Sequence, residues 1–506
     1  MTFRMIMIEL QSQQRAHVAR LTDVLTKHKC AIDLSVMGAG KTYTTSYLSL
    51  LPEFGFTQVV IICPVSVQPK WNSMAEKHGV PIMKCISYHC LRAARGRQPA
   101  HGLLHRFDQP VDVNGRSVNR VRFEPTEEFE QASREGLLLV VDEFQHLKNI
   151  SAQFEAVRSL VKAVKASTRS RCLLLSGSPF DRMEHSVALL KTLGIMVADE
   201  LTAYDRSSKT SVWTGAREVV AGCSRIDEHT TQQVVDAWRF CSPTHMAYQL
   251  FQQVVKPAIQ SNMPQPALEH HVSKYNAFYA MDPPDMLPKL TAGIEALKRV
   301  VGYDPAKNSV NFATSGVANT MGALTSAMCT IERAKIPTMI SAARKHLETH
   351  PQSKVVTCVN YTDSINELKQ ELAEFHPLVL DGRVPKDARA LVIDRFQRPD
   401  LEQRLLIGNM YVCSTGIDLD DKHGAFPRLC IVSPNYSTLT IHQLCHRFLR
   451  LDTKGSSEVQ MLYIKEATEL PVLAALAKKG VVMKDTTEDQ VKDGVLFPCD
   501  YPSKFI

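Results

Sequence analysis

The amino-acid sequence predicts an α/β fold in which two units with parallel sheets are joined by a helical bridge. Short runs that are apolar at every position recur near both ends of the chain, and stretches with helical spacing fill the middle. A strand that is apolar on both sides is typical of a parallel sheet covered by helices on both faces. The chain has 506 residues. At roughly 100 to 200 residues per domain, this length accommodates two to four domains.

Composition excludes several classes of protein. Hydrophobic residues make up 44% of the chain and charged residues 22%, which excludes long disorder. The 13 cysteines contain no Cys-x-x-Cys pair, so neither a zinc ribbon nor a thioredoxin-like site is expected. Scattered thiols fit a reducing compartment, and no apolar run approaches the roughly 20 residues of a membrane span. We therefore expect a soluble intracellular protein of the nucleus or cytoplasm, with no membrane partner. Its net charge of +7 slightly favours a polyanionic partner.

The strand pattern places the two units at residues 1–199 and 338–485. In the first unit, strands are predicted at 59–63, 137–141 and 172–175, and in the second at 354–359, 404–407 and 429–432. Residues 200–337 carry longer helical patterns, for example at 286–301 and 323–335, and are predicted to form the bridge. Residues 486–506 form a C-terminal tail in which no accessory module is recognisable.

A basic insertion interrupts the first unit at about residues 92–123. Asn114 and Gly115 lie between alternating residues, which is the strongest short signal for a β-hairpin. The insertion carries six arginines, at positions 95, 97, 106, 116, 120 and 122. It is either a solvated surface insertion or a contact for nucleic acid.

The segment Met37–Thr42 has the order and composition of a phosphate-binding loop. It follows the buried run Ala31–Leu34 and precedes a predicted helix at 43–51. Glycines let backbone N–H groups approach phosphates, Lys41 can neutralise the β and γ oxygens, and the Thr42 hydroxyl can hold Mg²⁺. Ser35 replaces the first glycine of the usual pattern, and a chance glycine-rich turn is the alternative interpretation.

Two carboxylates, Asp142 and Glu143, end the strand predicted at 137–141. Burying an acidic pair is costly unless a cation or hydrogen bonds compensate for it. Asp142 can complete the Mg²⁺ site begun by Thr42, while Glu143 can polarise the attacking water. The alternative is a strand that simply emerges into solvent.

Near the end of the second unit, Gln443, Arg447 and Arg450 follow one another at helical spacings, which predicts that they share one helix face. Two guanidinium groups suit the charge that develops on a γ-phosphate. Because they lie in the other unit from Lys41, hydrolysis would require the two units to close. A solvated basic helix face is the alternative.

Together these motifs resemble the superfamily 2 helicases and translocases, and within them the Swi/Snf-like DNA-dependent ATPases. In the first unit, the matches are to the N-terminal glutamine motif (Leu10–Arg15), motif I (Met37–Thr42), motif Ia (Val60–Trp71) and the strand after it (Ile86–Tyr88), motif II (Asp142–Asn149) and motif III (Leu174–Pro179). In the second unit, the matches are to motif IV (Val355–Tyr361) and its companion (Leu380–Gly382), motif V (Ser414–Leu419) and motif VI (Gln443–Arg450). The trailing Leu147-Lys148-Asn149 is a specific mark of the Swi/Snf type.

The resemblance implies two RecA-like lobes that use ATP and Mg²⁺, and it implies a role for each matching position. The catalytic residues would be Lys41, Glu143, Arg447 and Arg450, and the metal would be held by Thr42 and Asp142. The nucleotide would contact Gln14 (at the adenine), Gly38, Ala39, Gly40, Lys41, Thr42, Asp142, Gly416, Asp418 and Gln443. Nucleic acid would contact Pro64, Ser66, Ser414 and Thr415, mainly through its backbone. Ser176, Gly177 and Ser178 would couple the ATP state to the grip on nucleic acid.

The sequence departs from the family pattern in three places. Ser35 and Val36 replace the acidic pair that usually precedes the methionine of motif I, Phe144-Gln145 replaces a small residue and His in motif II, and motif V is shortened. The compact motifs and the continuation Leu451–Gly455 are also similar to helicase-like ATPases of large DNA viruses. If the protein is viral, we expect it in the virion or at the replication site.

The resemblance therefore leads us to expect a motor that couples ATP hydrolysis to translocation along DNA or to its remodelling, in transcription, chromatin or genome processing. DNA is favoured over RNA as the partner. The alternatives are a strand-separating DNA or RNA helicase, and a nucleotide-gated scaffold with little turnover.

Overall fold

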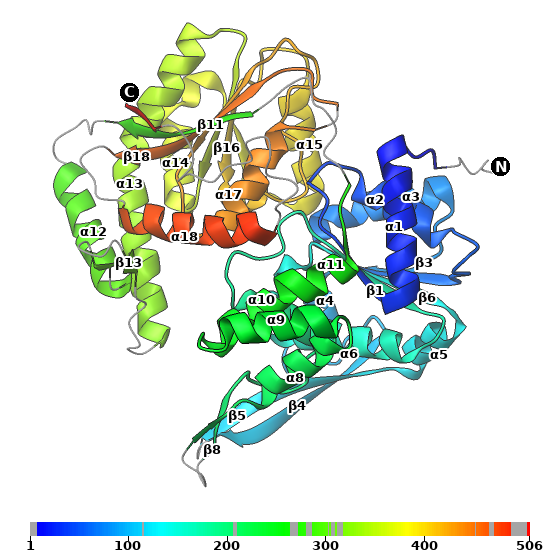
Figure 1. Ribbon diagram of the computed structural model, residues 1–506. Coiled ribbons are helices and arrows are strands. Elements are labelled where there is room, and N and C mark those ends of the chain that lie inside the picture. Colours follow the sequence, from blue (N-terminus) through cyan, green and yellow to red (C-terminus); the bar gives the residue numbers. More distant parts are fainter. Residues whose placement is uncertain are drawn as a thin grey trace. The chain divides into compact units, whose positions relative to one another are not determined.

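The computed structural model describes residues 8–113, 116–205, 210–263, 272–279, 286–301, 303–304, 309–310, 317–450, 452–464, 470–486 and 503–505. The chain divides into two compact units (Figure 1). The first comprises Met1–Gln265 with Asp485–Gln490, and the second comprises Pro266–Lys484 with Val491–Ile506. The segment expected to form the bridge, 200–337, is thus shared between the two units.

The first unit is built on a six-stranded parallel sheet with the order β10-β1-β7-β6-β2-β3. Its strands are β1 (Cys30–Asp33), β2 (Gln58–Ile62), β3 (Ile82–Ile86), β6 (Leu137–Asp142), β7 (Arg171–Leu175) and β10 (Gln260–Ser261). The apolar runs predicted as strands at 59–63, 137–141 and 172–175 are confirmed. Strand β6 is buried along its whole length, because helices cover both faces of the sheet.

Helices and short turns precede and connect the strands of this sheet. They are α1 (Ser12–His28), α2 (Lys41–Ser49), η1 (Val65–Val67), α3 (Gln68–His78), α4 (Tyr88–Arg92), α5 (Glu127–Glu135), η2 (Phe144–Leu147), α6 (Ala152–Ala166) and α7 (His185–Thr192). Helix α6 shows why they form. The Ser151 side chain accepts a hydrogen bond from Phe154 N, and Phe154, Leu160 and Val164 lie on its buried face.

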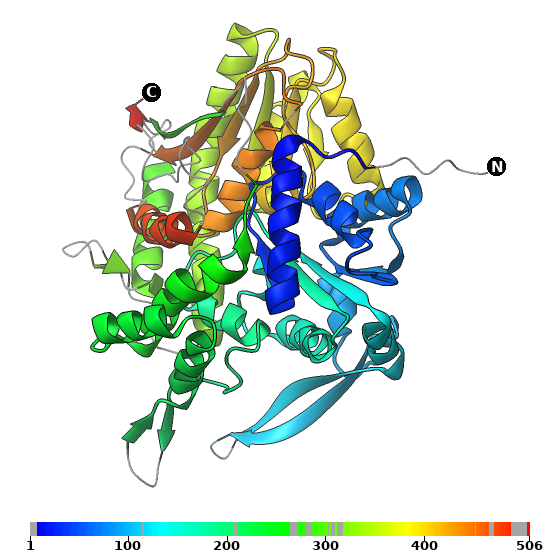
Figure 2. The same cartoon turned by 45° about the vertical axis from the view of Figure 1, so that its right-hand side comes forward.

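The predicted hairpin is confirmed by strands β4 (Leu104–Val113) and β5 (Arg116–Pro125), which pair antiparallel along their full length. The hairpin extends away from the first sheet (Figure 2). Asn114 and Gly115 themselves lie outside the described residues. A smaller hairpin is formed by β8 (Ala203–Asp205) and β9 (Thr210–Val212).

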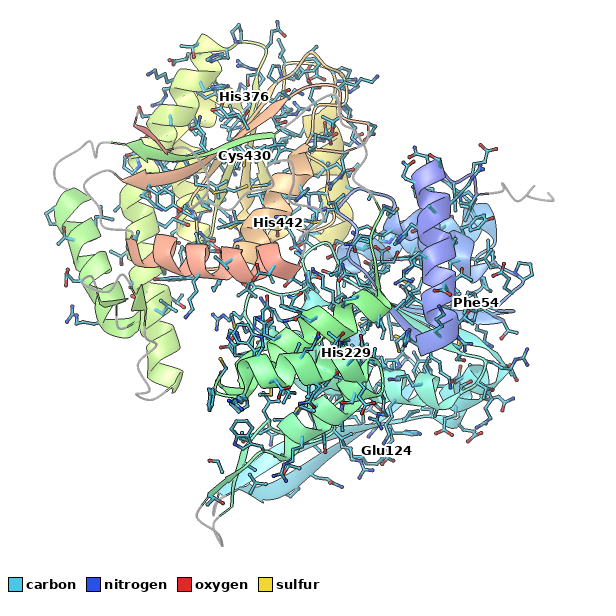
Figure 3. The ribbon with its side chains drawn as sticks, viewed as in Figure 1. Phe54, Glu124, His229, His376, Cys430 and His442 are labelled. Carbon is cyan, nitrogen blue, oxygen red and sulfur yellow. The ribbon has the colours of Figure 1, made fainter. Side chains whose placement is uncertain are left out.

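Three arginines of the hairpin have acidic partners. Arg106 is buried and pairs with Asp108, with 2.9 Å between Nη2 and Oδ1. Arg120 pairs with Asp199, and Arg122 pairs with Glu124, which is labelled in Figure 3. Arg106 also donates to two main-chain oxygens before the hairpin, at positions 92 and 93, so it fixes the base of the insertion. The role of the insertion in binding nucleic acid stays a prediction.

The rest of the first unit is helical and ends in the edge strand β10. It contains α8 (Thr214–Ser224), α9 (Glu228–Trp238), α10 (Pro243–Leu250), the π-helical turn η3 (Phe251–Val255) and α11 (Lys256–Ile259). Helices α8 and α9 bury apolar side chains such as Val219 and Val234. Strand β10 then adds to β1, with Ser261 opposite Asp33.

The second unit is built on a seven-stranded parallel sheet with the order β15-β16-β14-β17-β18-β11-β19. Its strands are β11 (Val272–Tyr279), β14 (Lys354–Val359), β15 (Leu378–Leu380), β16 (Leu405–Asn409), β17 (Arg428–Val432), β18 (Ser457–Ile464) and β19 (Ser503–Phe505). The predicted strands at 354–359, 404–407 and 429–432 are confirmed. Cys430, labelled in Figure 3, lies on the central strand β17 and is buried.

The helices and turns of this unit are α12 (Met286–Val301), α13 (Val317–Thr349), α14 (Thr362–Glu371), η4 (Ala373–Phe375), α15 (Lys386–Gln397), α16 (Met410–Cys413), α17 (Thr438–Cys445), η5 (His446–Phe448) and α18 (Leu470–Thr486). Strands β12 (Tyr303–Asp304) and β13 (Ser309–Val310) form a short antiparallel pair. In the part of the chain that the structure describes, no helix combines the length and apolarity needed to cross a bilayer.

Pro337 does not end a helix, although the helical pattern predicted at 323–335 stops just before it. Helix α13 continues through it to Thr349. An interior proline costs about 3 kcal/mol because it removes a backbone hydrogen bond. Ile336 and Met339, which flank Pro337, are fully buried in a core cluster of the second unit, and this packing offsets the loss.

Candidate active site

The phosphate-binding loop predicted at Met37–Thr42 connects β1 to α2. Gly38 and Gly40 have φ angles of 89° and 95°, a region that residues with a side chain rarely adopt. A Cβ atom at Gly40 would lie 2.5 Å from the Gln14 side-chain nitrogen. The backbone conformation at position 40 therefore favours glycine, and the end of the Gln14 side chain would have to move to admit a Cβ atom there. The loop leaves the N-terminus of α2 available to bind phosphate.

Lys41 and Thr42 open α2. The Lys41 ammonium group donates hydrogen bonds to the carbonyl oxygens of Ser35, at 2.7 Å, and Val36, at 3.2 Å, so it lies across the loop. The Thr42 side chain is buried. These are the two positions predicted to neutralise phosphate oxygens and to hold the metal.

Gln14 joins helix α1 to the same loop. Its side-chain oxygen accepts a hydrogen bond from Gln11 N at 3.0 Å, which forms part of a capping box at the start of α1. Its side-chain nitrogen lies 3.4 Å from the carbonyl oxygen of Ala39. The predicted adenine contact stays a prediction, and the structure adds a direct contact between Gln14 and the loop.

Asp142 lies at the carboxyl end of β6 and is held by two aromatic residues. Trp71 Nε1 donates to Asp142 Oδ2 at 2.9 Å, and the Tyr88 hydroxyl donates to the Asp142 carbonyl oxygen at 2.8 Å. Burial, and then the neighbouring Glu143 carboxylate, raise the pKa of Asp142 to about 6. Trp71, the last residue of the motif Ia match, is buried, and sequence reasoning missed that it orients the acid.

Glu143 begins a chain of hydrogen bonds to motif III. Its backbone has a φ of 58°, an unusual conformation for a residue with a side chain. The Gln145 side chain donates to Glu143 Oε2 at 2.6 Å and accepts a hydrogen bond from the Ser176 hydroxyl at 2.8 Å. Gln145, the departure from the usual His, therefore links the predicted catalytic acid to the predicted coupling segment.

Motif III also packs against motif I. A Cβ atom at Gly177 would lie 2.8 Å from Met37 Cγ and 3.3 Å from Met37 N, so the absence of a side chain permits this contact. Ser176 and Ser178 are fully buried, and the Ser178 amide donates to the Ser176 hydroxyl at 3.0 Å. Because the two segments are in contact, a displacement of the phosphate-binding loop would therefore displace motif III as well.

The residues present fit a magnesium ion. Asp142 is a buried carboxylate whose pKa is raised by burial and by the neighbouring Glu143 carboxylate, so a cation beside it would stabilise its charged form. Mg²⁺ prefers oxygen ligands and commonly binds one or two protein oxygens together with substrate phosphates. Asp142 and the Thr42 hydroxyl would hold it, and the ion would neutralise negative charge on the phosphates.

In the second unit, both arginines of motif VI are bound to motif V. Arg447 Nε donates to the Ser414 carbonyl oxygen at 2.7 Å, and Arg450 Nε pairs with Asp418 Oδ1 at 2.7 Å. Burial raises the pKa of Asp418, but the charge of Arg450 and the hydrogen bond from it outweigh this effect and leave the pKa below its ordinary value.

The prediction that Gln443, Arg447 and Arg450 share one helix face is wrong. Helix α17 ends at Cys445, Arg447 lies in the 3₁₀ turn η5, and Leu449 is extended, with φ −143° and ψ 124°. The Arg447 carbonyl oxygen accepts a hydrogen bond from Leu419 N, so bonds to motif V replace the continuation of the helix. His442, on α17, is labelled in Figure 3.

The remaining predicted contacts lie at the carboxyl ends of the strands. Ser66, in η1 after β2, is exposed, and Pro64 precedes that turn. Ser414 is buried, and its hydroxyl donates to the Tyr411 carbonyl oxygen at 2.9 Å. Thr415 is partly exposed and donates to the same oxygen at 3.1 Å. Of these four residues, Ser66 is therefore the most exposed to solvent. Gly416, with a φ of 69°, and the half-buried Gln443 complete the predicted nucleotide positions.

Sequence reasoning missed a polar network at the end of β14. Glu332, buried on α13, accepts hydrogen bonds from the main-chain amides of Asn360 and Tyr361 at 2.9 to 3.0 Å, and from the Asn360 side chain at 2.6 Å. Asn409 donates to the Asn360 carbonyl oxygen at 3.0 Å and also caps α16, directly before motif V. The network therefore connects motifs IV and V.

Two protein families match the chain in the regions just described. The SNF2-related domain matches residues 12–265, and the helicase conserved C-terminal domain matches residues 338–452. The chain belongs to the SNF2-related family. It is thus an ATP-hydrolysing enzyme of superfamily 2, and its two parallel-sheet units are RecA-like lobes.

Individual relatives are distant. The chain is 33% identical over 79 residues to the putative ATP-dependent RNA helicase L364 of Acanthamoeba polyphaga mimivirus. That segment spans 16% of this chain and 14% of the relative. The SWI2/SNF2 ATPase core of Sulfolobus solfataricus, solved in complex with dsDNA, aligns over 97% of both chains with 13% identity and a TM-score of 0.33.

Proposed function

We propose that this SNF2-related ATPase couples hydrolysis to movement along DNA, or to its remodelling, by gripping the nucleic-acid backbone at the carboxyl ends of its strands. The observation that carries the proposal is the hydrogen-bond chain Glu143–Gln145–Ser176. It joins the acid beside the phosphate-binding loop to the segment after β7, so a change at the nucleotide can alter the strand ends. A protein that only bound ATP would have no need of such a link.

In the cycle that we propose, Lys41 and the N-terminus of α2 bind the phosphates, and Glu143 orients the attacking water. Mg²⁺, held by Thr42 and Asp142, supplies positive charge to the phosphates. Arg447 and Arg450 stabilise the charge that develops in the transition state, so hydrolysis requires both lobes. Gln14, Gly416, Asp418 and Gln443 complete the nucleotide site.

The partner that we propose is double-stranded DNA, because the motif II continuation Leu147–Asn149 is of the Swi/Snf type. Its contacts would be backbone contacts by Pro64, Ser66 and the motif V hydroxyls, which hold register without reading sequence. The mimivirus relative is named as an RNA helicase, so RNA belongs among the substrates to be tested.

The test is steady-state ATP hydrolysis by the whole chain, alone and with double-stranded DNA, single-stranded DNA or single-stranded RNA. Lys41→Ala is the blank. We expect the largest stimulation with double-stranded DNA. Stimulation only by a single strand would replace the proposal with a strand-separating helicase, and no stimulation by any of them would refute nucleic-acid coupling.

A comparison of one variant with the parent protein tests the alternative of a nucleotide-gated scaffold. Glu143→Gln keeps the size of the side chain and a hydrogen-bonding partner for Gln145 but removes the charge that polarises water. We expect its hydrolysis to fall at least about 100-fold while ADP binding stays close to that of the parent protein. A parent protein with no measurable turnover would leave the scaffold as the surviving function.

A further inference from the structure

A buried charged group lies beneath the phosphate-binding loop and belongs to none of the motifs described above. Asp33, the last residue of β1, is fully buried, and its Oδ2 lies 3.0 Å from Nε2 of His17 on α1. The other ring nitrogen of His17 lies 2.9 Å from the Ser261 hydroxyl on β10. The consecutive elements α1 and β1 thus meet β10, which is distant in sequence, through three buried polar side chains.

The second oxygen of Asp33 extends this network to the loop. Asp33 Oδ1 accepts a hydrogen bond from Ser35 N at 2.8 Å, and the Ser35 hydroxyl accepts one from Met263 N at 2.8 Å. The Ser35 carbonyl oxygen accepts the hydrogen bond from the Lys41 ammonium group. The N–H, the hydroxyl and the carbonyl of Ser35 are therefore all engaged, and the last of these contacts is to the residue that binds phosphate.

Packing alone does not account for an acid at position 33. An apolar residue would fill the space in β1 without the large cost of burying a carboxylate. Burial raises the pKa of Asp33, but the His17 ring and the charge of Lys41 outweigh it and leave the pKa below its ordinary value. The carboxylate is thus stabilised in its charged form by groups that also fix the loop.

We propose that His17, Asp33 and Ser261 are positioning residues of the ATP site, which fix Ser35 and thereby set the resting position of the Lys41 ammonium group. The hydrogen bonds of these three side chains reach the loop at Ser35 N, so they act through Ser35. Ser35 is where this sequence departs from the usual motif I, and its hydroxyl, which accepts the hydrogen bond from Met263 N, makes the one contact of the three that a glycine could not make.

The experiment measures the dissociation constant of a fluorescent ADP analogue with Mg²⁺, and the KM and kcat for ATP, on the full chain. The variants are Asp33→Asn and Ser261→Ala. The matched control is Ser170→Ala, because Ser170 is also a fully buried serine of the first unit. The Ser170 hydroxyl accepts a hydrogen bond from Leu137 N and donates one to the Ser133 carbonyl oxygen. Ser170 directly precedes β7, and these bonds do not involve the phosphate-binding loop.

We expect Asp33→Asn to raise the dissociation constant for the ADP analogue about 10-fold and Ser261→Ala to raise it about 3-fold, with KM for ATP rising more than kcat falls. Ser170→Ala should stay within about two-fold of the parent protein even if its melting temperature falls. Ser261→Thr, which keeps the hydroxyl, should restore binding.

The proposal is overturned if folded Asp33→Asn and Ser261→Ala bind ADP as tightly as the parent protein. It is equally overturned if Ser170→Ala weakens binding as much as Ser261→Ala, because the effect would then be general destabilisation. If Asp33→Asn does not fold, the comparison of Ser261→Ala, Ser261→Thr and Ser170→Ala decides the matter. All these measurements are made without nucleic acid, so their outcome is independent of the function proposed above.

Discussion

Replacing the buried acid Asp142 with asparagine should make the metal-free protein more stable while it abolishes hydrolysis. The pKa of Asp142 is raised from 3.8 to about 6, mainly by burial. The difference between the two values, at about 1.4 kcal/mol for each pKa unit, corresponds to about 3 kcal/mol. Above pH 6 the folded protein carries an ionised carboxylate that is less stable than it is in the unfolded chain. The Asp142→Asn change removes this penalty, and the amide oxygen that it introduces can still accept the hydrogen bond from Trp71.

The sign of the effect fixes its dependence on pH. Because the folded pKa lies above the unfolded one, the destabilisation by Asp142 is complete at pH 8 and disappears as the pH falls from about 6 towards 3.8. The gain for Asp142→Asn should therefore be about 3 kcal/mol at pH 8 and about 1 kcal/mol at pH 4.5. At pH 8 this corresponds to a rise of roughly 6 to 12 °C in melting temperature.

The assay is thermal unfolding in EDTA, followed by tryptophan fluorescence at pH 8 and pH 4.5. Asp33→Asn is the control with the opposite sign, because the pKa of Asp33 is lowered and its charged form stabilises the fold above its unfolded pKa. Asp33→Asn should thus lose stability at pH 8. A loss of stability in Asp142→Asn at pH 8, or an equal gain at both pH values, would refute the reasoning.

Three further outcomes are expected. Gln145→Ala removes the hydrogen bonds that link Glu143 to Ser176, so kcat with nucleic acid should fall about 10-fold while ADP affinity changes less than about two-fold. Unchanged stimulation by nucleic acid would show that the link does not contribute to coupling. Glu332→Ala leaves the amides of Asn360 and Tyr361 unpaired, so the free energy of unfolding measured in urea should fall by about 3 kcal/mol. Glu332→Gln should lower it by less, and equal losses in the two variants would contradict the role of these hydrogen bonds. Raising salt from about 50 to about 200 mM should weaken nucleic-acid binding at least 10-fold, and salt-insensitive binding would exclude backbone contacts.

The sequence predicted the two sheets because their strands are apolar on both faces. Runs such as Leu137–Val141 can only be buried, and in parallel sheets they mark the strands with little ambiguity. The end of α17 was not predictable from spacing. The sequence Gln443–Arg450 is compatible with a helix, and tertiary bonds to motif V, such as that from Leu419 N to Arg447 O, take the place of its continuation.

Sequence reasoning proposes site residues where chemistry dictates residue type, as at Lys41 and Asp142, and it missed residues that act through another residue. Trp71 and Glu332 have no local signature, because their roles depend on partners 71 and 28 positions away. One signal was present in the sequence. Asp33 interrupts the apolar run Ala31–Leu34, and a charge inside a buried strand requires a buried partner.

The pairing of β10 with β1 also has a consequence for synthesis of the chain. Strand β1 and the loop leave the ribosome early, but the edge of β1 that receives β10 stays uncovered until residue 261 has been made. At about 5 to 20 residues per second, the delay is roughly 10 to 45 s. During this time β1 presents an unpaired edge, and His17, which contacts Asp33, lacks its other partner Ser261. The nascent first lobe is therefore most prone to misfolding, and most in need of chaperones, just before its final strand emerges.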